Sequence, residues 1–78
     1  MSRLKKEVEG MDAKKIGQKL RELRGVFRTQ EEVAAAVGID RATLSRYENG
    51  QQIPSDEVKL ALARYYGQPV ESIFFADE

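Results

Sequence analysis

The sequence contains no cysteine and no histidine, and both absences narrow the functions that it can have. Without cysteine the chain has no disulfide framework and no thiolate metal site, so its core must be stable without a covalent cross-link. Histidine and cysteine are also the usual general bases, nucleophiles and zinc ligands near neutral pH. No persuasive pair of carboxylates replaces them. We therefore expect that the protein is not an enzyme and that it needs no metal or other cofactor.

Long apolar runs are absent as well. The longest, such as residues 33–37, are far too short to span a bilayer, and the N-terminus lacks the apolar stretch of a signal peptide. These features predict a cytoplasmic protein without a membrane partner. The 78 residues suffice for one domain with one core, so neither a separate sensing module nor a small-molecule ligand is expected.

An excess of one charge is also missing, because the net charge is zero. The charges are nevertheless unevenly distributed: residues 1–30 carry nine Lys/Arg and four Asp/Glu, whereas residues 31–78 carry four and nine. Nucleic-acid-binding domains are commonly basic. Binding to a nucleic acid would therefore depend on the local placement of charge rather than on the average.

The apolar spacing and the helix end signals predict a compact all-α fold of five helices. Asp12 is a plausible N-cap for the first helix, which ends near Gly25, and residues 29–32 form a capping box for the second, which ends before Gly38. We expect a flexible leader or short extra helix over 1–13, the domain over 14–75 and a tail over 76–78. The inward positions predicted for the first two helices are Ile16, Leu20, Leu23, Val33, Ala34 and Val37.

The remaining three helices follow from the same signals. Asp40 is a good N-cap for a third helix over 41–49, Ser55 caps a fourth that ends at Gly67, and Pro69 opens a short last helix. The inward positions predicted for them are Leu44, Tyr47, Val58, Leu62, Ala63, Tyr66, Val70, Ile73 and Phe74.

The second and third helices, joined by a tight glycine turn, are the elements of a DNA-reading helix-turn-helix. With Leu44 and Tyr47 inward, the third helix presents a polar outer face. An arginine on that face fits the edge of a guanine, a small residue can meet a thymine methyl group, and a hydroxyl can bond a base or a phosphate. The residues placed there are Arg41, Ala42, Thr43, Ser45 and Arg46.

Residues 16–74 resemble the Xre/Cro family of lambda-repressor-like helix-turn-helix domains. The motifs that carry the resemblance are Ile16-Gly17, residues 20–24, residues 29–34, residues 37–39, residues 44–50 with Pro54 beyond, Gly67 and residues 70–74. The resemblance implies base contacts by Arg41, Ala42, Thr43 and Arg46, and a phosphate contact by Gln30 at the start of the second helix. It also implies backbone contacts by Asn49 and Gln51 and a structural ion pair between Arg24 and Glu48. We assign Thr29 and Ser45 to the same DNA-backbone surface.

Two departures from the family pattern stand out. The link formed by residues 25–28 is one residue shorter than usual and lacks the customary Lys-Gly-Leu. Whether Arg28 contacts a phosphate is therefore left open at this stage. Lys59 occupies a position that is commonly apolar in the fourth helix. We expect Val58 to take the core position in its place.

The function that these features favour is a sequence-specific regulator of transcription, expected to repress and to bind a palindromic double-stranded DNA operator as a homodimer. The apolar cluster at the C-terminus is larger than one short helix needs, so we expect Ile73 and Phe75 at the dimer interface. The alternative is an interaction module or antitoxin-like component that retains the fold without binding DNA. Its contact surface would be the acidic half of the chain, comprising Glu31, Glu32, Asp56, Glu57, Glu71, Asp77 and Glu78.

Overall fold

The computed structural model describes residues 12–75, and within this range the chain forms five helices and no strand. They are α2 (Ala13–Arg24), α3 (Gln30–Val37), α4 (Arg41–Glu48), α5 (Asp56–Tyr66) and α6 (Val70–Phe74). The expected all-α fold of five helices is confirmed. Residues 1–11 of the leader expected over 1–13 lie outside the described residues, and so does the whole tail expected over 76–78.

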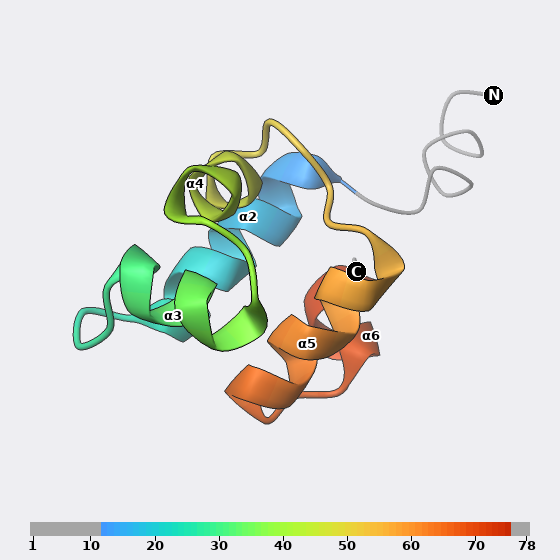
Figure 1. Cartoon of the computed structure of the whole chain (residues 1–78). Helices are drawn as coiled ribbons and strands as arrows, with labels where there is room; N and C mark the ends of the chain where they lie inside the picture. Colours follow the sequence, from blue (N-terminus) through green and yellow to red (C-terminus); the bar gives the residue numbers. More distant parts are fainter. Residues whose placement is uncertain (1–11, 76–78) are drawn as a thin grey trace, which may run out of the picture.

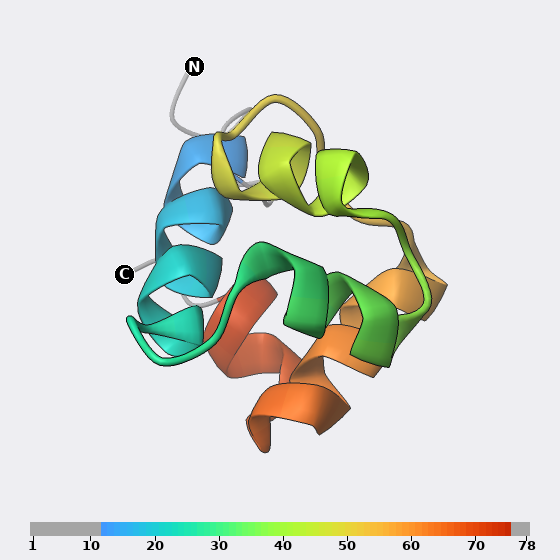
Figure 2. The same cartoon turned by 60° about the vertical axis from the view of Figure 1, so that its left-hand side comes forward.

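The helices form two groups around a shared core. In both views α4 lies against α2 and α3, while α5 and α6 lie on the opposite side of the molecule (Figures 1 and 2). α5 packs on α3 and α6, and α6 also contacts α2. One face of α4 is thereby docked on the core, and its other face has no helix over it among the described residues.

Side chains at the helix starts explain where the helices begin. Asp12 accepts a hydrogen bond from the main-chain nitrogen of Lys14 at 3.0 Å. Thr29 and Glu32 form the predicted capping box, with Thr29 Oγ1 accepting from Glu32 N at 3.0 Å and Glu32 Oε1 accepting from Thr29 N at 3.1 Å. Asp40 and Ser55 cap α4 and α5 in the same way.

The turn between α3 and α4 is short because α3 ends at a left-handed glycine. Gly38 has φ 84°, a conformation that L side chains rarely adopt, and its N–H donates to the carbonyl oxygen of Ala34 at 2.9 Å. Ile39 N donates to the same oxygen at 2.9 Å, so the chain folds back over the last turn of α3. Asp40 then starts α4 at once, which gives the helix-turn-helix its compact corner.

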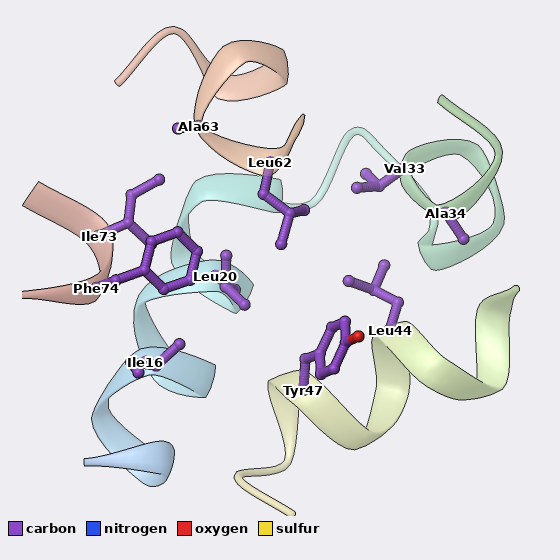
Figure 3. Close-up of a cluster of buried hydrophobic side chains, with 10 residues drawn as sticks. All are labelled: Ile16, Leu20, Val33, Ala34, Leu44, Tyr47, Leu62, Ala63, Ile73 and Phe74. Carbon is purple, nitrogen blue, oxygen red and sulfur yellow. The ribbon is translucent and has the colours of Figure 1, made fainter. Parts of the chain in front are cut away.

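The core draws two buried apolar residues from each helix, and they meet at the centre of the molecule (Figure 3). Leu20, Leu44 and Leu62 are completely buried, and full burial of such a side chain stabilises a fold by about 1.5–3 kcal/mol. The other members are Ile16, Val33, Ala34, Tyr47, Ala63, Ile73 and Phe74. Leu44 and Tyr47 anchor α4 by its inner face and leave the predicted polar face outward.

The expectation that Val58 replaces Lys59 in the core is wrong. Lys59 is only 7% exposed, whereas Val58 is half-buried against the edge of the core. The aliphatic stem of a lysine can pack in an apolar layer while its ammonium group reaches a polar or aromatic partner. Here Nζ lies 3.5 Å from Oδ1 of the exposed Asp56, and 6.0 and 5.6 Å from the ring centroids of Phe74 and Phe75.

The C-terminal apolar cluster divides between the core and the surface. Ile73 is 4% exposed and packs inside the domain, so it offers little surface to a partner. Phe75 is 48% exposed. Of the two residues expected at an interface, only Phe75 is available to a partner.

Candidate nucleic-acid interface

The outer face of α4 brings together the four residues expected to contact bases. Arg41 and Ala42 are exposed in the first turn, Arg46 is exposed one turn later, and Thr43 is half-buried at the flank. The N-cap fixes this first turn, because Thr43 N donates to Asp40 Oδ1 at 2.9 Å. Hydrogen bonds from the side chain and main chain of Thr43 also hold the pKa of the Asp40 carboxyl below its usual 3.8. A short helix anchored at its start and along its inner face is a rigid carrier for these side chains.

Arg41 and Arg46 differ in how they are held. Arg41 Nε lies 3.9 Å from Glu31 Oε2, and both side chains are largely exposed, so this pair restrains Arg41 weakly. Arg46 donates from Nε to Gln52 Oε1 at 3.1 Å and from Nη2 to Thr43 Oγ1 at 3.3 Å. Gln52 is not among the residues predicted for the site, because its contact with Arg46 depends on how the chain turns after α4.

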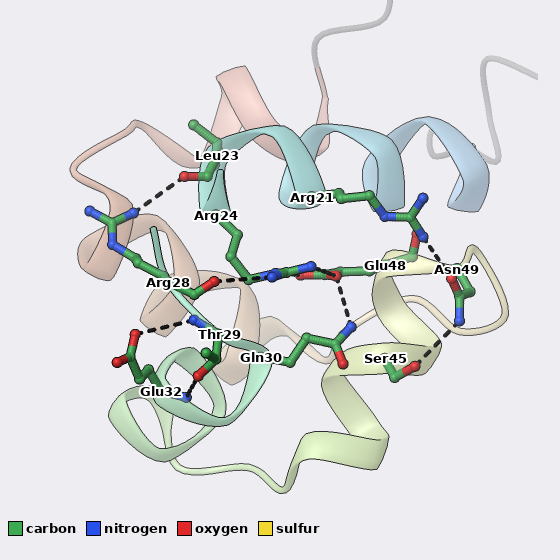
Figure 4. A network of polar contacts seen from close by, with 10 residues as sticks. All are labelled: Arg21, Leu23, Arg24, Arg28, Thr29, Gln30, Glu32, Ser45, Glu48 and Asn49. Atoms are coloured by element: carbon green, nitrogen blue, oxygen red, sulfur yellow. Dashed lines mark hydrogen bonds and ion pairs between the residues drawn. The ribbon is translucent and has the colours of Figure 1, made fainter. Parts of the chain in front are cut away.

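Two of the residues expected on the DNA backbone, Ser45 and Asn49, form a second polar group at the end of α4 (Figure 4). Asn49 donates from Nδ2 to Ser45 Oγ at 3.3 Å and accepts at Oδ1 from Arg21 Nη2 at 2.7 Å. Gln51 is exposed directly after them. Arg21 is not among the residues predicted for the site, because it belongs to α2 and joins this group only through the packing of α2 on α4.

Glu48 is the centre of the network in Figure 4. Its side chain is completely buried and accepts two hydrogen bonds from Arg24, from Nε to Oε2 at 2.8 Å and from Nη2 to Oε1 at 3.0 Å. These hydrogen bonds to Glu48 raise the pKa of Arg24. The network ties the end of α2 to the end of α4.

Gln30 completes this network. Its Nε2 donates to Glu48 Oε1 at 3.0 Å, so in the free protein the amide points toward the carboxylate. Arg24 also donates from Nη1 to the carbonyl of Arg28 at 3.1 Å, which holds the loop before α3. The starting point of α3, where a phosphate contact is expected, is therefore fixed by the same ion pair.

Arg28 is held toward α5. Its guanidinium lies 5.4 and 5.6 Å from the ring centroids of Tyr65 and Tyr66, and its Nη1 donates to the carbonyl of Leu23 at 3.3 Å. The Tyr66 hydroxyl is buried with no hydrogen-bond partner among the described residues. Burial, and next the charge of Glu48, raise the pKa of Tyr66 to about 12, so it stays protonated at neutral pH.

A positively charged pocket of about 520 Å³ lies between the network and the start of α3. Its lining contains four guanidinium groups against two carboxylates. Glu48 is paired with Arg24, and Glu31 lies 3.9 Å from Arg41, so the guanidinium groups remain in excess. The first amides of a helix also have no carbonyl partner within it and favour an anion. The lining residues are Arg21, Arg24, Arg28, Thr29, Gln30, Glu31, Arg41 and Glu48.

Other kinds of site find no support in the described part of the chain. Over residues 12–75 no group of three or more Asp, Glu, His or Cys side chains could hold a metal ion. Nor does any helix in that range have the length and apolar character needed to cross a membrane.

Two short helices joined at a glycine corner, with a polar face on the second and a basic pocket at the start of the first, define a helix-turn-helix domain. The family model described as a helix-turn-helix domain matches residues 15–73. The chain therefore belongs to this family, in its Xre/Cro-like branch, as the sequence resemblance predicts. This is a class of DNA-binding regulators rather than of enzymes.

The chain is similar to regulators from several organisms. It is 38% identical over 61 residues to an HTH-type transcriptional regulator of Archaeoglobus fulgidus. The matched region covers 77% of this chain and 86% of that protein. It is 42% identical over 44 residues to the cryptic phage CTXphi transcriptional repressor RstR of Vibrio cholerae, over 56% of this chain and 40% of RstR.

Among solved structures, the restriction-modification controller protein C.AhdI of Aeromonas hydrophila is similar in fold. The TM-score is 0.75 at 36% sequence identity, over 81% of this chain and 97% of C.AhdI.

Proposed function

We propose that this protein is a sequence-specific double-stranded DNA-binding regulator of transcription that places α4 in the major groove of its operator. The observation that carries the proposal is the outer face of α4, where Arg41, Ala42 and Arg46 are exposed on a helix anchored by Leu44 and Tyr47. Arginine can bond the O6 and N7 atoms of guanine together, and a methyl-sized side chain can meet thymine. These are the chemical types that base reading requires.

We propose that a backbone phosphate binds in the basic pocket at the start of α3. Arg21 and Arg41 both line the pocket, and the unpaired amides at the start of a helix favour an anion as well. Gln30 then contacts the phosphate with the second hydrogen on Nε2, because the first is bonded to Glu48. Thr29 lies at the same helix start. Ser45, Asn49 and Gln51 extend the backbone contact beyond α4.

We propose further that the protein acts as a homodimer on a roughly palindromic operator in the cytoplasm, and that it represses. One α4 covers only a few base pairs, so two half-sites multiply specificity. Phe75, which is 48% exposed at the end of α6, supports an apolar contact between two copies. Repression is supported by the similarity to RstR, which is named a repressor.

The test is selection of bound sequences from a random duplex pool, followed by gel-shift titration of the selected duplex. We expect one enriched motif with two inverted halves. Neutralisation of about 3–5 phosphates per monomer should give a log–log salt slope of about −3 to −4.5 per monomer. Absence of binding at low salt would contradict the proposal and favour a protein-interaction module instead.

A further inference from the structure

The guanidinium group of Arg46 is held from two sides in the free protein. Gln52 Oε1 accepts from Nε at 3.1 Å, and Thr43 Oγ1 accepts from Nη2 at 3.3 Å. Thr43 lies one turn earlier on α4, whereas Gln52 lies in the segment that follows the helix. An exposed arginine otherwise samples many rotamers, so two partners on different sides define one direction for its planar end.

The main chain brings Gln52 to this place. Gly50 has φ 75°, and its N–H donates to the carbonyl of Tyr47 at 3.2 Å. Gln51 N then donates to the carbonyl of Arg46 at 2.9 Å, so the chain turns back over the last turn of α4. Gln52 is thereby fixed beside Arg46 by the helix end, and not only by its own side-chain bond.

The bond to Gln52 selects which edge of the guanidinium can meet DNA. Arginine has five N–H donors, and the single hydrogen on Nε is used by Gln52. The hydrogens on Nη1 and the second hydrogen on Nη2 stay available. Together they form the end of the fork, which can donate to O6 and N7 of one guanine.

We propose that Gln52 is a specificity-positioning residue, which orients Arg46 for an end-on contact with guanine without reading a base itself. The proposal rests on the proposed DNA-binding function. Orientation before binding lowers the conformational cost of the contact in the complex. Gln52 therefore acts on the preference at the base pair that Arg46 reads.

Two full-length variants separate this role from a phosphate contact by Gln52. Gln52→Met keeps the length of the side chain and removes the acceptor, whereas Gln52→Glu keeps an acceptor for Arg46 Nε. The probe is the duplex selected by the wild-type protein, together with duplexes substituted at the base pair whose preference disappears in Arg46→Ala. Discrimination at that pair should be roughly 5- to 150-fold in the wild-type protein, the range for one bidentate contact.

We expect Gln52→Met to reduce this discrimination several-fold and Gln52→Glu to retain most of it, although the added negative charge weakens binding to every duplex. In an Arg46→Ala background, Gln52→Met should leave the remaining preferences unchanged. Equal weakening of cognate and random duplexes by Gln52→Met would overturn the proposal and make Gln52 a backbone contact.

A measurement on the free protein separates this proposal from the proposed function. The Arg46 Nε–H resonance should exchange slowly with solvent in the wild-type protein and faster in Gln52→Met. If the Arg46 Nε–H exchanges with solvent at the same rate in both proteins, Gln52 does not hold Arg46. The inference then fails whatever the result of the DNA-binding measurements. If exchange differs but no duplex is bound, both the proposed function and the specificity role fail, while the contact stands.

Discussion

Gly17 on α2 lies directly against the main chain at the end of α4, where a Cβ would come within 2.5 Å of the carbonyl oxygens of both Tyr47 and Glu48. No Cβ is found so close to backbone atoms, so this contact is possible only for glycine. It sets how near α2 approaches the helix proposed to read DNA. It also brings the end of α2 within reach of Glu48.

We predict that Gly17→Ala destabilises the protein by about 1–3 kcal/mol, because the helices must move apart to admit the methyl group. This cost opposes the gain of up to about 1 kcal/mol that alanine brings to a helix interior. Urea unfolding would measure it, with Gln18→Ala at the exposed neighbouring position as the control. A Gly17→Ala protein more stable than the wild type would mean that α2 and α4 are not in contact there.

We predict that Arg24→Ala costs about 1–3 kcal/mol of stability, because it leaves the buried Glu48 carboxylate with Gln30 as its remaining side-chain donor. Glu48→Ala should cost less than Arg24→Ala, since the Arg24 side chain is 18% exposed and can regain water. The double variant should lose less than the sum of the two. Additive losses in this double-mutant cycle would show that the pair contributes no coupling.

Lys59→Met should be neutral or stabilising, within about 1 kcal/mol, because methionine keeps the buried stem and removes the need to accommodate an ammonium group. The partner Asp56 is 97% exposed and stays hydrated after the change. Thermal unfolding would measure the effect, and Lys59→Asp, which loses both the stem and the charge pair, is the destabilising comparison. A large loss in Lys59→Met would show that the contacts of Nζ with Phe74, Phe75 and Asp56 dominate.

We predict that Phe75→Glu weakens self-association by about 2 kcal/mol, roughly thirtyfold in the dimer dissociation constant, while the monomer stays folded. The new carboxylate would lie half-exposed near Lys59, so it has both water and a partner. Phe27→Glu is the matched control, because Phe27 is 95% exposed in the loop between α2 and α3. Sedimentation equilibrium that shows unchanged association in Phe75→Glu would remove this residue from the interface.

Arg46→Ala and Gln30→Ala should both weaken operator binding, but only Arg46→Ala should change which bases are preferred. Loss of an arginine–guanine contact should cost about 1–3 kcal/mol and relax one position per half-site. Loss of a phosphate contact should weaken binding to cognate and random DNA alike. Arg64→Ala, at an exposed position on α5, controls for the loss of a positive charge alone. An equal effect of Arg46→Ala on all sequences would make Arg46 a backbone clamp.

The local features of this protein are determined by the sequence itself. Asp12, Thr29, Asp40 and Ser55 start their helices, because a capping side chain bonds main-chain amides two or three residues away. Leu44 and Tyr47 likewise define the inner face of α4 by their spacing, and so they also define which residues lie outward. Such features need only short-range geometry, which a sequence displays directly.

The contacts between helices were decided by the tertiary structure. Lys59 is buried because of what α5 packs against, and the spacing of apolar residues along the helix does not show what the helix packs against. Arg21 reaches Asn49 across 28 positions of sequence, and Gln52 reaches Arg46 only after the chain turns at Gly50. The residues that could touch bases follow from the sequence, whereas the side chains that hold them in place depend on distances that exist only once the helices have packed.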